Sequence, residues 1–158
     1  TMAIYGLPYT DDELLFLQNV ALPGWIALAL MPKNRMAHRF AVFLAVLAGL
    51  LYTALMVTMS AEGSLDDFKL ETMTSLDGLT KAFTRKELVL AGWIHYVAFD
   101  LMAAVWSCQD AAKRDVPHLL LLPVLFFTLM AGPIGLVLYM IVRLPFSVKE
   151  QASKPKEA

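Results

Sequence analysis

The run Trp93-Ile-His-Tyr-Val-Ala-Phe-Asp-Leu-Met-Ala-Ala-Val-Trp106 decides how this chain must fold. It lies within an apolar segment, residues 88–107, that is long enough to cross a bilayer as a helix. Near the middle of that segment stands a carboxylic acid, Asp100, and His95 precedes it on the same helix. A charged group at that depth costs about 2.5–3.5 kcal/mol on insertion scales. We therefore expect Asp100 to have either a partner or a function.

Apolar residues gather in blocks, as is typical of a membrane protein. The chain of 158 residues is 58% hydrophobic, whereas soluble domains are nearer to about 45–50%. A spanning helix needs about 20 apolar residues, and four blocks meet or nearly meet that length: residues 14–31, 40–60, 88–107 and 118–142. None of them alternates as the strands of a barrel would. The sequence predicts an all-α fold, a bundle of four transmembrane helices that forms a single membrane domain over residues 1–146.

The segments outside the four blocks are polar. In the loop between the second and third spans, residues 61–87, apolar side chains recur every three to five residues, which indicates an interfacial helix on the membrane or a cap packed on the bundle. Thr10-Asp-Asp-Glu13 and Thr84-Arg-Lys-Glu87 are capping boxes that predict the starts of the first and third spans. The polar tail, residues 147–158, is rich in Lys, Glu and Ala and is expected to be disordered.

Composition excludes several classes of function. The net charge of −1 provides no basic surface for nucleic acid. Cys108 is the single cysteine, so an internal disulfide and a cysteine-based metal site are both excluded. The three histidines and Asp100 show none of the spacings of metal ligands on a helix, and we expect no metal. Residues 1–9 lack the basic and apolar regions of a signal peptide.

Charge leaves the orientation in the membrane open. Four crossings would place both termini and the long polar loop on one face and the two short loops on the other. The basic first loop, with Lys33 and Arg35, favours the short loops on the cytosol- or stroma-like side. Arg85, Lys86 and Arg143 argue for the opposite orientation.

The third span carries the candidate catalytic residues. Tyr96 and Asp100 are four residues apart and share a helix face, while His95 and Phe99 belong to a neighbouring stripe. An apolar pocket in which Asp100, His95 and Tyr96 converge would disfavour the charged forms of the acid and the imidazole, which suits proton transfer. Alternatively, Asp100 pairs with His95, Tyr96 or a polar group of another helix and only locks the bundle.

Other polar residues are weaker candidates. Gln18 and Asn19 form a second polar point inside the first span. His118 follows Pro117 at the start of the fourth span and is expected at the interface. We expect His38 on a solvated loop face or beside lipid phosphates.

Several motifs follow one another in a specific order: Trp93-Ile-His-Tyr-Val-Ala-Phe-Asp100, Trp106, Gln109-Asp-Ala-Ala112, Val116-Pro-His-Leu-Leu120, Thr128 and Gly132-Pro-Ile-Gly-Leu136. This order resembles the abscisic-acid-deficient-4-like family, small four-helix membrane proteins of plastids with bacterial relatives. The resemblance is strongest over residues 88–143, and Asn19, Pro23 and Trp25 anchor it in the first span.

The resemblance implies a role in xanthophyll metabolism. Plant members are required for making neoxanthin from violaxanthin, a step that opens an epoxide to an allene. It implies an integral protein of a plastid membrane, thylakoid or inner envelope, with a carotenoid as ligand, acting as a carotenoid isomerase or an essential partner of one. Asp100 would then be the acid, oriented by His95 or Tyr96. The ligand-binding residues expected are Trp93, Phe99, Trp106, His118 and Asn19.

A second function stays open beside the enzymatic one. The chain could be a non-catalytic pigment-binding or scaffold subunit of a photosystem or antenna supercomplex, with lipid and light-harvesting subunits as its partners. Chlorophyll would then be the cofactor, with its magnesium held by one of His95, His118, His38, Gln18 or Asn19. A lipid or proton transporter is less favoured, because four helices with one internal acid offer a thin pathway.

Overall fold

The computed structural model describes residues 10–63, 65 and 74–148, and these contain no strand. The elements are α1 (Asp11–Leu17), the 3-10 helix η1 (Gln18–Ala21), α2 (Leu22–Leu30), α3 (Arg35–Ala61), α5 (Leu76–Ala82), α6 (Lys86–Arg114) and α7 (His118–Val142). Four helical segments are long and apolar enough to cross a membrane: Asp12–Leu30, Arg35–Ala61, Lys86–Arg114 and His118–Val142. The predicted all-α fold with four such segments is confirmed. Most of the tail predicted to be disordered lies outside the described residues.

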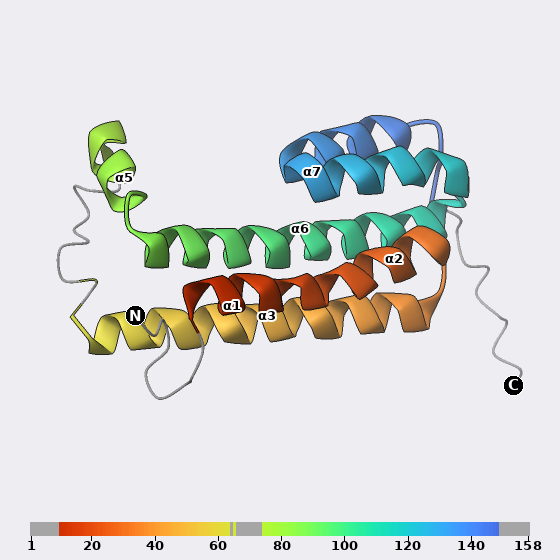
Figure 1. The fold of residues 1–158 in the computed structure, drawn as a ribbon. Coiled ribbons are helices and arrows are strands. Elements are labelled where there is room, and N and C mark those ends of the chain that lie inside the picture. Colours follow the sequence, from red (N-terminus) through yellow and green to blue (C-terminus); the bar gives the residue numbers. More distant parts are fainter. Residues whose placement is uncertain (1–9, 64, 66–73, 149–158) are drawn as a thin grey trace, which may run out of the picture.

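Two long helices, α3 and α6, form the frame of the molecule, and the chain α1–η1–α2 runs along both (Figure 1). With 27 and 29 residues, α3 and α6 are about 40 Å and 44 Å long, which exceeds the thickness of a bilayer core. The first segment is interrupted by η1 just before Pro23, which has no N–H to donate within the helix. Small buried side chains let the helices approach closely, among them Ala41 and Ala45 of α3 and Ala104 of α6.

One of the two predicted capping boxes is present. The Glu13 amide donates to the Thr10 hydroxyl (3.3 Å), and the Thr10 amide donates to the Glu13 carboxylate (2.7 Å). The prediction at Thr84 is wrong, because its hydroxyl donates to the Lys81 carbonyl (2.7 Å) at the end of α5. The N-cap of α6 is Arg85, whose side chain makes no capping bond to the first turn of the helix. The described part of the polar loop does contain a short helix, α5.

The fourth segment does not run straight but turns back on itself at Ala131. The backbone there is non-helical, with φ −158° and ψ 61°, and the parts of α7 before and after it lie side by side (Figure 1). A Cβ added to Gly135 would lie 2.5 Å from the Cα of Thr128. Residues seven apart in a straight helix are separated by about 10 Å, so this contact requires a reversal. We call α7 the helical hairpin and residues 131–133 its apex.

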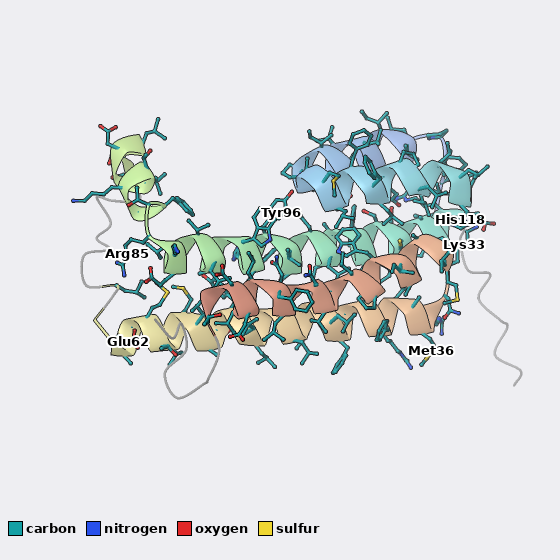
Figure 2. All side chains as sticks on the ribbon, viewed as in Figure 1. Lys33, Met36, Glu62, Arg85, Tyr96 and His118 are labelled. Atoms are coloured by element: carbon teal, nitrogen blue, oxygen red, sulfur yellow. The ribbon has the colours of Figure 1, made fainter. Side chains whose placement is uncertain are left out.

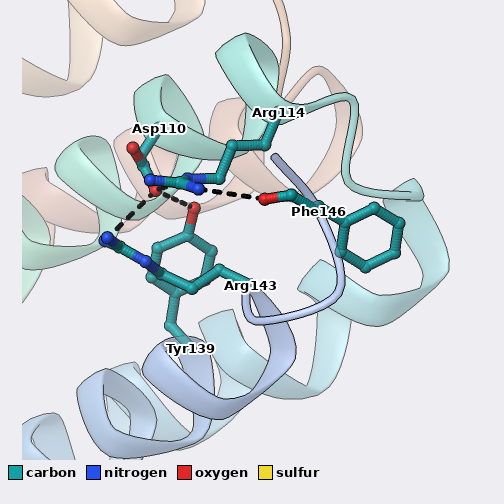
Figure 3. Close-up of polar contacts among 5 residues, drawn as sticks. All are labelled: Asp110, Arg114, Tyr139, Arg143 and Phe146. Carbon is teal, nitrogen blue, oxygen red and sulfur yellow. Dashed lines mark hydrogen bonds and ion pairs between the residues drawn. The ribbon is translucent and has the colours of Figure 1, made fainter. Parts of the chain in front are cut away.

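A cluster of charged residues fastens the returning half of the hairpin to α6 (Figure 3). One carboxylate oxygen of Asp110 accepts a hydrogen bond from the Tyr139 hydroxyl (2.8 Å) and lies 3.3 Å from the Arg143 guanidinium. The same oxygen accepts from Arg114 (2.7 Å), which also donates to the Phe146 carbonyl (2.9 Å). Asp110 lies in the final turns of α6, so the hairpin ends near the membrane face at which it began. We call these five residues the Asp110 clamp.

The reversal changes the expected path through the membrane. The two halves, residues 118–130 and 132–142, are about 20 Å and 16 Å long, which is too short to cross a core of about 30 Å. The C-terminal end of the described chain therefore shares a face with the Lys33 loop, and the expectation that both termini share a face with the long polar loop is wrong. Non-helical backbone at membrane depth requires cover by protein, and Gly132 of the apex is buried.

This path also removes the ambiguity in the charge distribution. Among the described residues, the face of the Lys33 loop carries Lys33, Arg35, Arg39, Lys113, Arg114 and Arg143. The opposite face carries Lys81, Arg85 and Lys86. The face of the Lys33 loop therefore carries more of the described Lys and Arg residues than the opposite face, because the hairpin brings Arg143 to it. We expect that face on the cytosol- or stroma-like side.

Cysteine accessibility tests this path. In a Cys108→Ala background, single cysteines are placed by Lys33→Cys, Glu62→Cys and Val148→Cys, all at exposed positions. With a membrane-impermeant maleimide on sealed vesicles, the cysteines at 33 and 148 should react from the same side and the cysteine at 62 from the other. A hairpin that instead crosses the membrane would make residue 148 behave like residue 62.

The packing of the apex gives a second prediction. A Cβ at Gly132 would lie 2.6 Å from Cγ of Asp100, so Gly132→Ala should lower stability by about 1–3 kcal/mol, the usual cost of overpacking. Gly49→Ala is the matched control, because a Cβ there meets nothing within 4 Å. Thermal unfolding in detergent measures both variants. Adding Asp100→Ala to Gly132→Ala should recover part of the loss; equal midpoints for the Gly132 and Gly49 variants would refute the close contact.

Candidate functional site

The apex of the hairpin meets α6 at Asp100. This side chain is buried, with 9% of its surface exposed. Its carboxylate interacts with the Tyr96 side chain and the Gly132 backbone, and the Gly132 amide donates to the Tyr96 hydroxyl (3.2 Å). Figure 2 shows Tyr96 projecting from α6 toward the end of α7 at which the hairpin turns. Asp100, Tyr96 and Gly132 therefore form one polar cluster in the middle of the bundle.

The returning half of the hairpin supplies an electrostatic reason for this cluster. Its helix begins at the apex, so its first N–H groups have no partner within the helix and its positive end faces Asp100. Pro133 lies in this first turn, where a missing N–H removes no helical hydrogen bond. A carboxyl group beside the positive end of a helix is favourable whether it is charged or only polarised. The other carboxylate oxygen, Oδ2, is buried with no hydrogen-bond partner among the described residues.

A groove opens beside this cluster. Its inner part has a volume of about 660 Å³ and is lined mainly by apolar and aromatic side chains from η1, α2, α6 and the hairpin, among them Trp25, Trp93, Tyr96, Leu129 and Met130. A second hollow of about 530 Å³ shares Gln18, Val89 and Trp93 with it and reaches Asp12, Thr84 and Lys86. We call these the inner and outer groove. Together they form an elongated, mostly apolar site that runs from the depth of the hairpin apex to the polar ends of α1 and α6.

Three residues expected to bind the ligand or act on it lie in the inner groove. Trp93 and Tyr96 line it from α6, with ring centroids 5.9 Å apart, and Asn19 lines it from η1. Asp100 does not line the groove but lies behind Tyr96. Tyr96 therefore lies between the groove and Asp100, and its hydroxyl could pass a proton between them.

His95 and Phe99 lie on another face of α6. The two rings are exposed and stack on each other at 4.5 Å, and His95 also meets the edge of Tyr52 at 5.5 Å. The structure therefore does not bring His95 together with Asp100. Neither His95 nor Phe99 lines the inner or the outer groove.

Trp106 belongs to the surroundings of the Asp110 clamp. Its ring packs edge-on against Tyr139 at 5.4 Å, and the guanidinium of Arg143 lies 5.7 Å from its ring centre. Trp106 lines neither part of the groove.

The remaining histidines hold helix ends together. His118 bonds the Ala29 carbonyl through Nε2 (2.7 Å), which ties the start of the hairpin to the end of α2. His38 bonds the Pro32 carbonyl through Nε2 (2.7 Å) and is buried, with 7% exposed. The expectation of a solvated His38 is wrong, because the ring folds under the loop that it stabilises.

Sequence reasoning missed the role of Gly132 and of the Asp110 clamp. Gly132 was visible only as part of a Gly-Pro motif that could equally mark a kink. The i, i+4 spacing of Asp110 and Arg114 signals an ion pair on a helix, but nothing local shows that Tyr139 and Arg143 return to it. The sequence marks Gln18 only as a polar residue within the first span, whereas in the structure its Oε1 is buried without a hydrogen-bond partner among the described residues.

The polar cluster and the groove occur in a chain that matches one known family. The model of the ABA DEFICIENT 4-like family matches residues 15–139, which is most of the chain. No curated protein and no solved structure gives a match. The matched range includes every element of the groove except the start of α1, as well as Asp100, Tyr96 and the hairpin apex. This chain belongs to the ABA DEFICIENT 4-like family.

Proposed function

We propose that this protein acts in xanthophyll metabolism in a photosynthetic membrane, as the plastid members of its family do, and isomerises a carotenoid epoxide to an allene. One observation carries the proposal: Tyr96 lines the groove and its hydroxyl contacts the buried acid Asp100. Tyr96 would thus be a proton donor at the wall of a mostly apolar groove in a protein with four helices able to span a membrane.

The groove suits an elongated apolar molecule. Pockets for small molecules usually measure about 300–1,000 Å³ and are lined by apolar and aromatic side chains with a few polar groups. The inner groove has this character, with Trp25 and Trp93 as aromatic walls and Tyr96, Gln18 and Asn19 as polar points. A ring of the carotenoid would occupy the inner groove, and the polyene would extend along the apolar surface of the helices.

The chemistry requires only the transfer of a proton within one molecule. Tyr96 donates its phenolic proton to the epoxide oxygen and is re-protonated by the carboxyl group of Asp100. The bond between this oxygen and the polyene-side ring carbon breaks, its electron pair stays on the oxygen as a hydroxyl, and the polyene delocalises the positive charge. The adjacent chain carbon then loses its proton through Tyr96 to the Asp100 carboxylate, and the electrons of that C–H bond complete the allene. No oxidant, reductant or metal is consumed.

These roles differ from the sequence-based expectation. Asp100 was expected to act directly on the ligand with His95 or Tyr96 orienting it, whereas the groove exposes Tyr96 and keeps Asp100 behind it. In the proposal Tyr96 is the catalytic acid and Asp100 the proton source that positions it. His95 has no part in the step, because it lies on another face of α6.

Conversion of violaxanthin to neoxanthin in a violaxanthin-accumulating host tests this proposal. Tyr96→Phe should lower the rate by about 10²–10⁴-fold, the usual contribution of a general acid, and Asp100→Asn should lower it comparably. Tyr52→Phe, which removes a hydroxyl from α3 outside the groove, should leave the rate unchanged. Violaxanthin that co-purifies with the inactive Tyr96→Phe protein would separate loss of chemistry from loss of binding. Full neoxanthin formation by this variant would exclude Tyr96 as the acid.

A second candidate function, a pigment-binding subunit, rests on His95. The Nε2 atoms of His38 and His118 bond carbonyls, whereas His95 is exposed and none of the described residues hydrogen-bonds its ring. His95 is thus the histidine that a chlorophyll magnesium could reach from the surface. Purification from the native membrane tests this reading: chlorophyll that is bound by the wild type and lost in His95→Leu would support it, and a pigment-free protein that converts violaxanthin would exclude it.

A further inference from the structure

The side chain of Gln18 lies where the inner and outer groove meet. It belongs to the 3-10 helix η1 and lines both hollows. Its Oε1 atom is buried, yet no described residue donates a hydrogen bond to it. An acceptor left unsatisfied away from water destabilises a protein, and most buried polar groups in proteins are paired.

The polar neighbours in the inner groove do not remove this deficit. The Tyr96 hydroxyl contacts Asp100 and accepts from the Gly132 amide, and in the proposed step its single proton goes to the epoxide oxygen. In the outer groove, the Thr84 hydroxyl donates to Lys81, and Asp12 has no proton to donate when ionised. Other lining residues carry N–H donors, but none of them bonds Oε1: Asn19, Trp25, Trp93 and Lys86. The missing donor is therefore best supplied by the molecule that fills the groove.

We propose that Gln18 accepts a hydrogen bond from a ring hydroxyl of the carotenoid and so selects xanthophylls over unhydroxylated carotenes. This inference rests on the proposed function. An epoxidised xanthophyll ring carries a hydroxyl and an epoxide oxygen on the same six-membered ring. Gln18 and Tyr96 line the same inner groove, so one ring can offer its hydroxyl to the first and its epoxide to the second. Gln18 is then a specificity-determining residue that fixes which face of the ring meets the acid.

The preference for a hydroxylated ring arises because leaving a buried acceptor unpaired costs more free energy than one hydrogen bond contributes on average. A carotene in the groove would leave Oε1 buried and unpaired, as it is among the described residues. A hydroxylated ring would pair with it once the Gln18 amide turns toward the groove. Sites built to pair a substrate hydroxyl reject analogues that lack it, because the protein group is left unpaired. One net hydrogen bond corresponds to a preference of about 2–12-fold, and a buried unpaired acceptor would increase it further.

Binding of two probes of the same length tests the inference. Zeaxanthin carries a hydroxyl on each ring, and β-carotene has the same carbon skeleton without hydroxyls. Quenching of tryptophan fluorescence reports binding, because Trp25 and Trp93 line the groove. The wild type, reconstituted as the full chain in nanodiscs, should bind zeaxanthin about tenfold more tightly than β-carotene. Gln18→Met, similar in length but without the amide oxygen, should bind both probes equally.

Two controls keep the result interpretable. Gln109→Met makes the same chemical change on α6 outside both grooves and should leave the preference intact. Gln18→Met should also unfold at the same or a higher temperature without ligand, because it replaces an unsatisfied acceptor by an apolar group. A clear loss of ligand-free stability would mean that Gln18 has a structural partner, and would overturn the inference.

The outcomes separate this inference from the proposed function. Equal binding of the two probes by the wild type, or a preference that survives in Gln18→Met, would refute the role of Gln18 and leave the carotenoid site standing. A wild type that binds neither probe would refute the carotenoid site itself.

Discussion

The contact between the Asp100 carboxyl group and the backbone of Gly132 is the constraint on which the rest of this structure depends. A helical hairpin that turns inside a membrane leaves N–H groups at its apex with no water to receive them. A carboxylic acid inside a membrane has the complementary problem, because it needs donors that lipid cannot supply. Here the Gly132 backbone and the Tyr96 hydroxyl interact with the carboxyl group, whose Oδ2 has no partner among the described residues, and the absence of a Cβ at Gly132 lets the two chain segments meet. The position of Tyr96, whose hydroxyl joins both groups, follows from that contact.

The other end of the hairpin is held by a different kind of interaction. Asp110 lies in the last turns of α6 and contacts Tyr139 and Arg143 of the returning half. These contacts of the Asp110 clamp keep the end of the hairpin at the face where the hairpin begins. Charge-assisted hydrogen bonds of this kind are stronger than neutral ones, and the single oxygen of Asp110 receives three such contacts. The hairpin is thus fixed at its apex by Asp100 and at its base by Asp110, two acids ten residues apart on one helix. This pair of anchors sets the depth of the hairpin, and with it the distribution of basic residues between the two faces.

The sequence alone predicted much of the fold and part of the site. Long apolar blocks were sufficient for the four helical segments, and the spacing of Tyr96 and Asp100 was sufficient for their shared face. The prediction that His95 lies beside Asp100 is wrong. Two side chains five residues apart on a helix point about 140° away from each other, and here only the face of α6 with Asp100 contacts the hairpin. The reversal at Ala131 was not predictable from local pattern, since Pro and Gly within an apolar run fit a kink as well as a turn. The information that decides between them is long-range: the pairing of Asp110 with Tyr139 and Arg143, and the close approach of Gly135 to Thr128.

The hairpin also links the ligand site to the buried acid. Leu129 and Met130, the last residues before the turn, line the inner groove, and Gly132, directly after it, contacts Asp100. Any movement of the apex away from α6 would change the wall of the groove and the environment of the carboxyl group together. In the proposed reaction, the proton donor and the ligand are therefore positioned by the same few residues, and the precision that proton transfer requires depends on how tightly the apex is held. A single buried acid would then have two roles: Asp100 contacts the apex of the hairpin, and in the proposed reaction it re-protonates Tyr96.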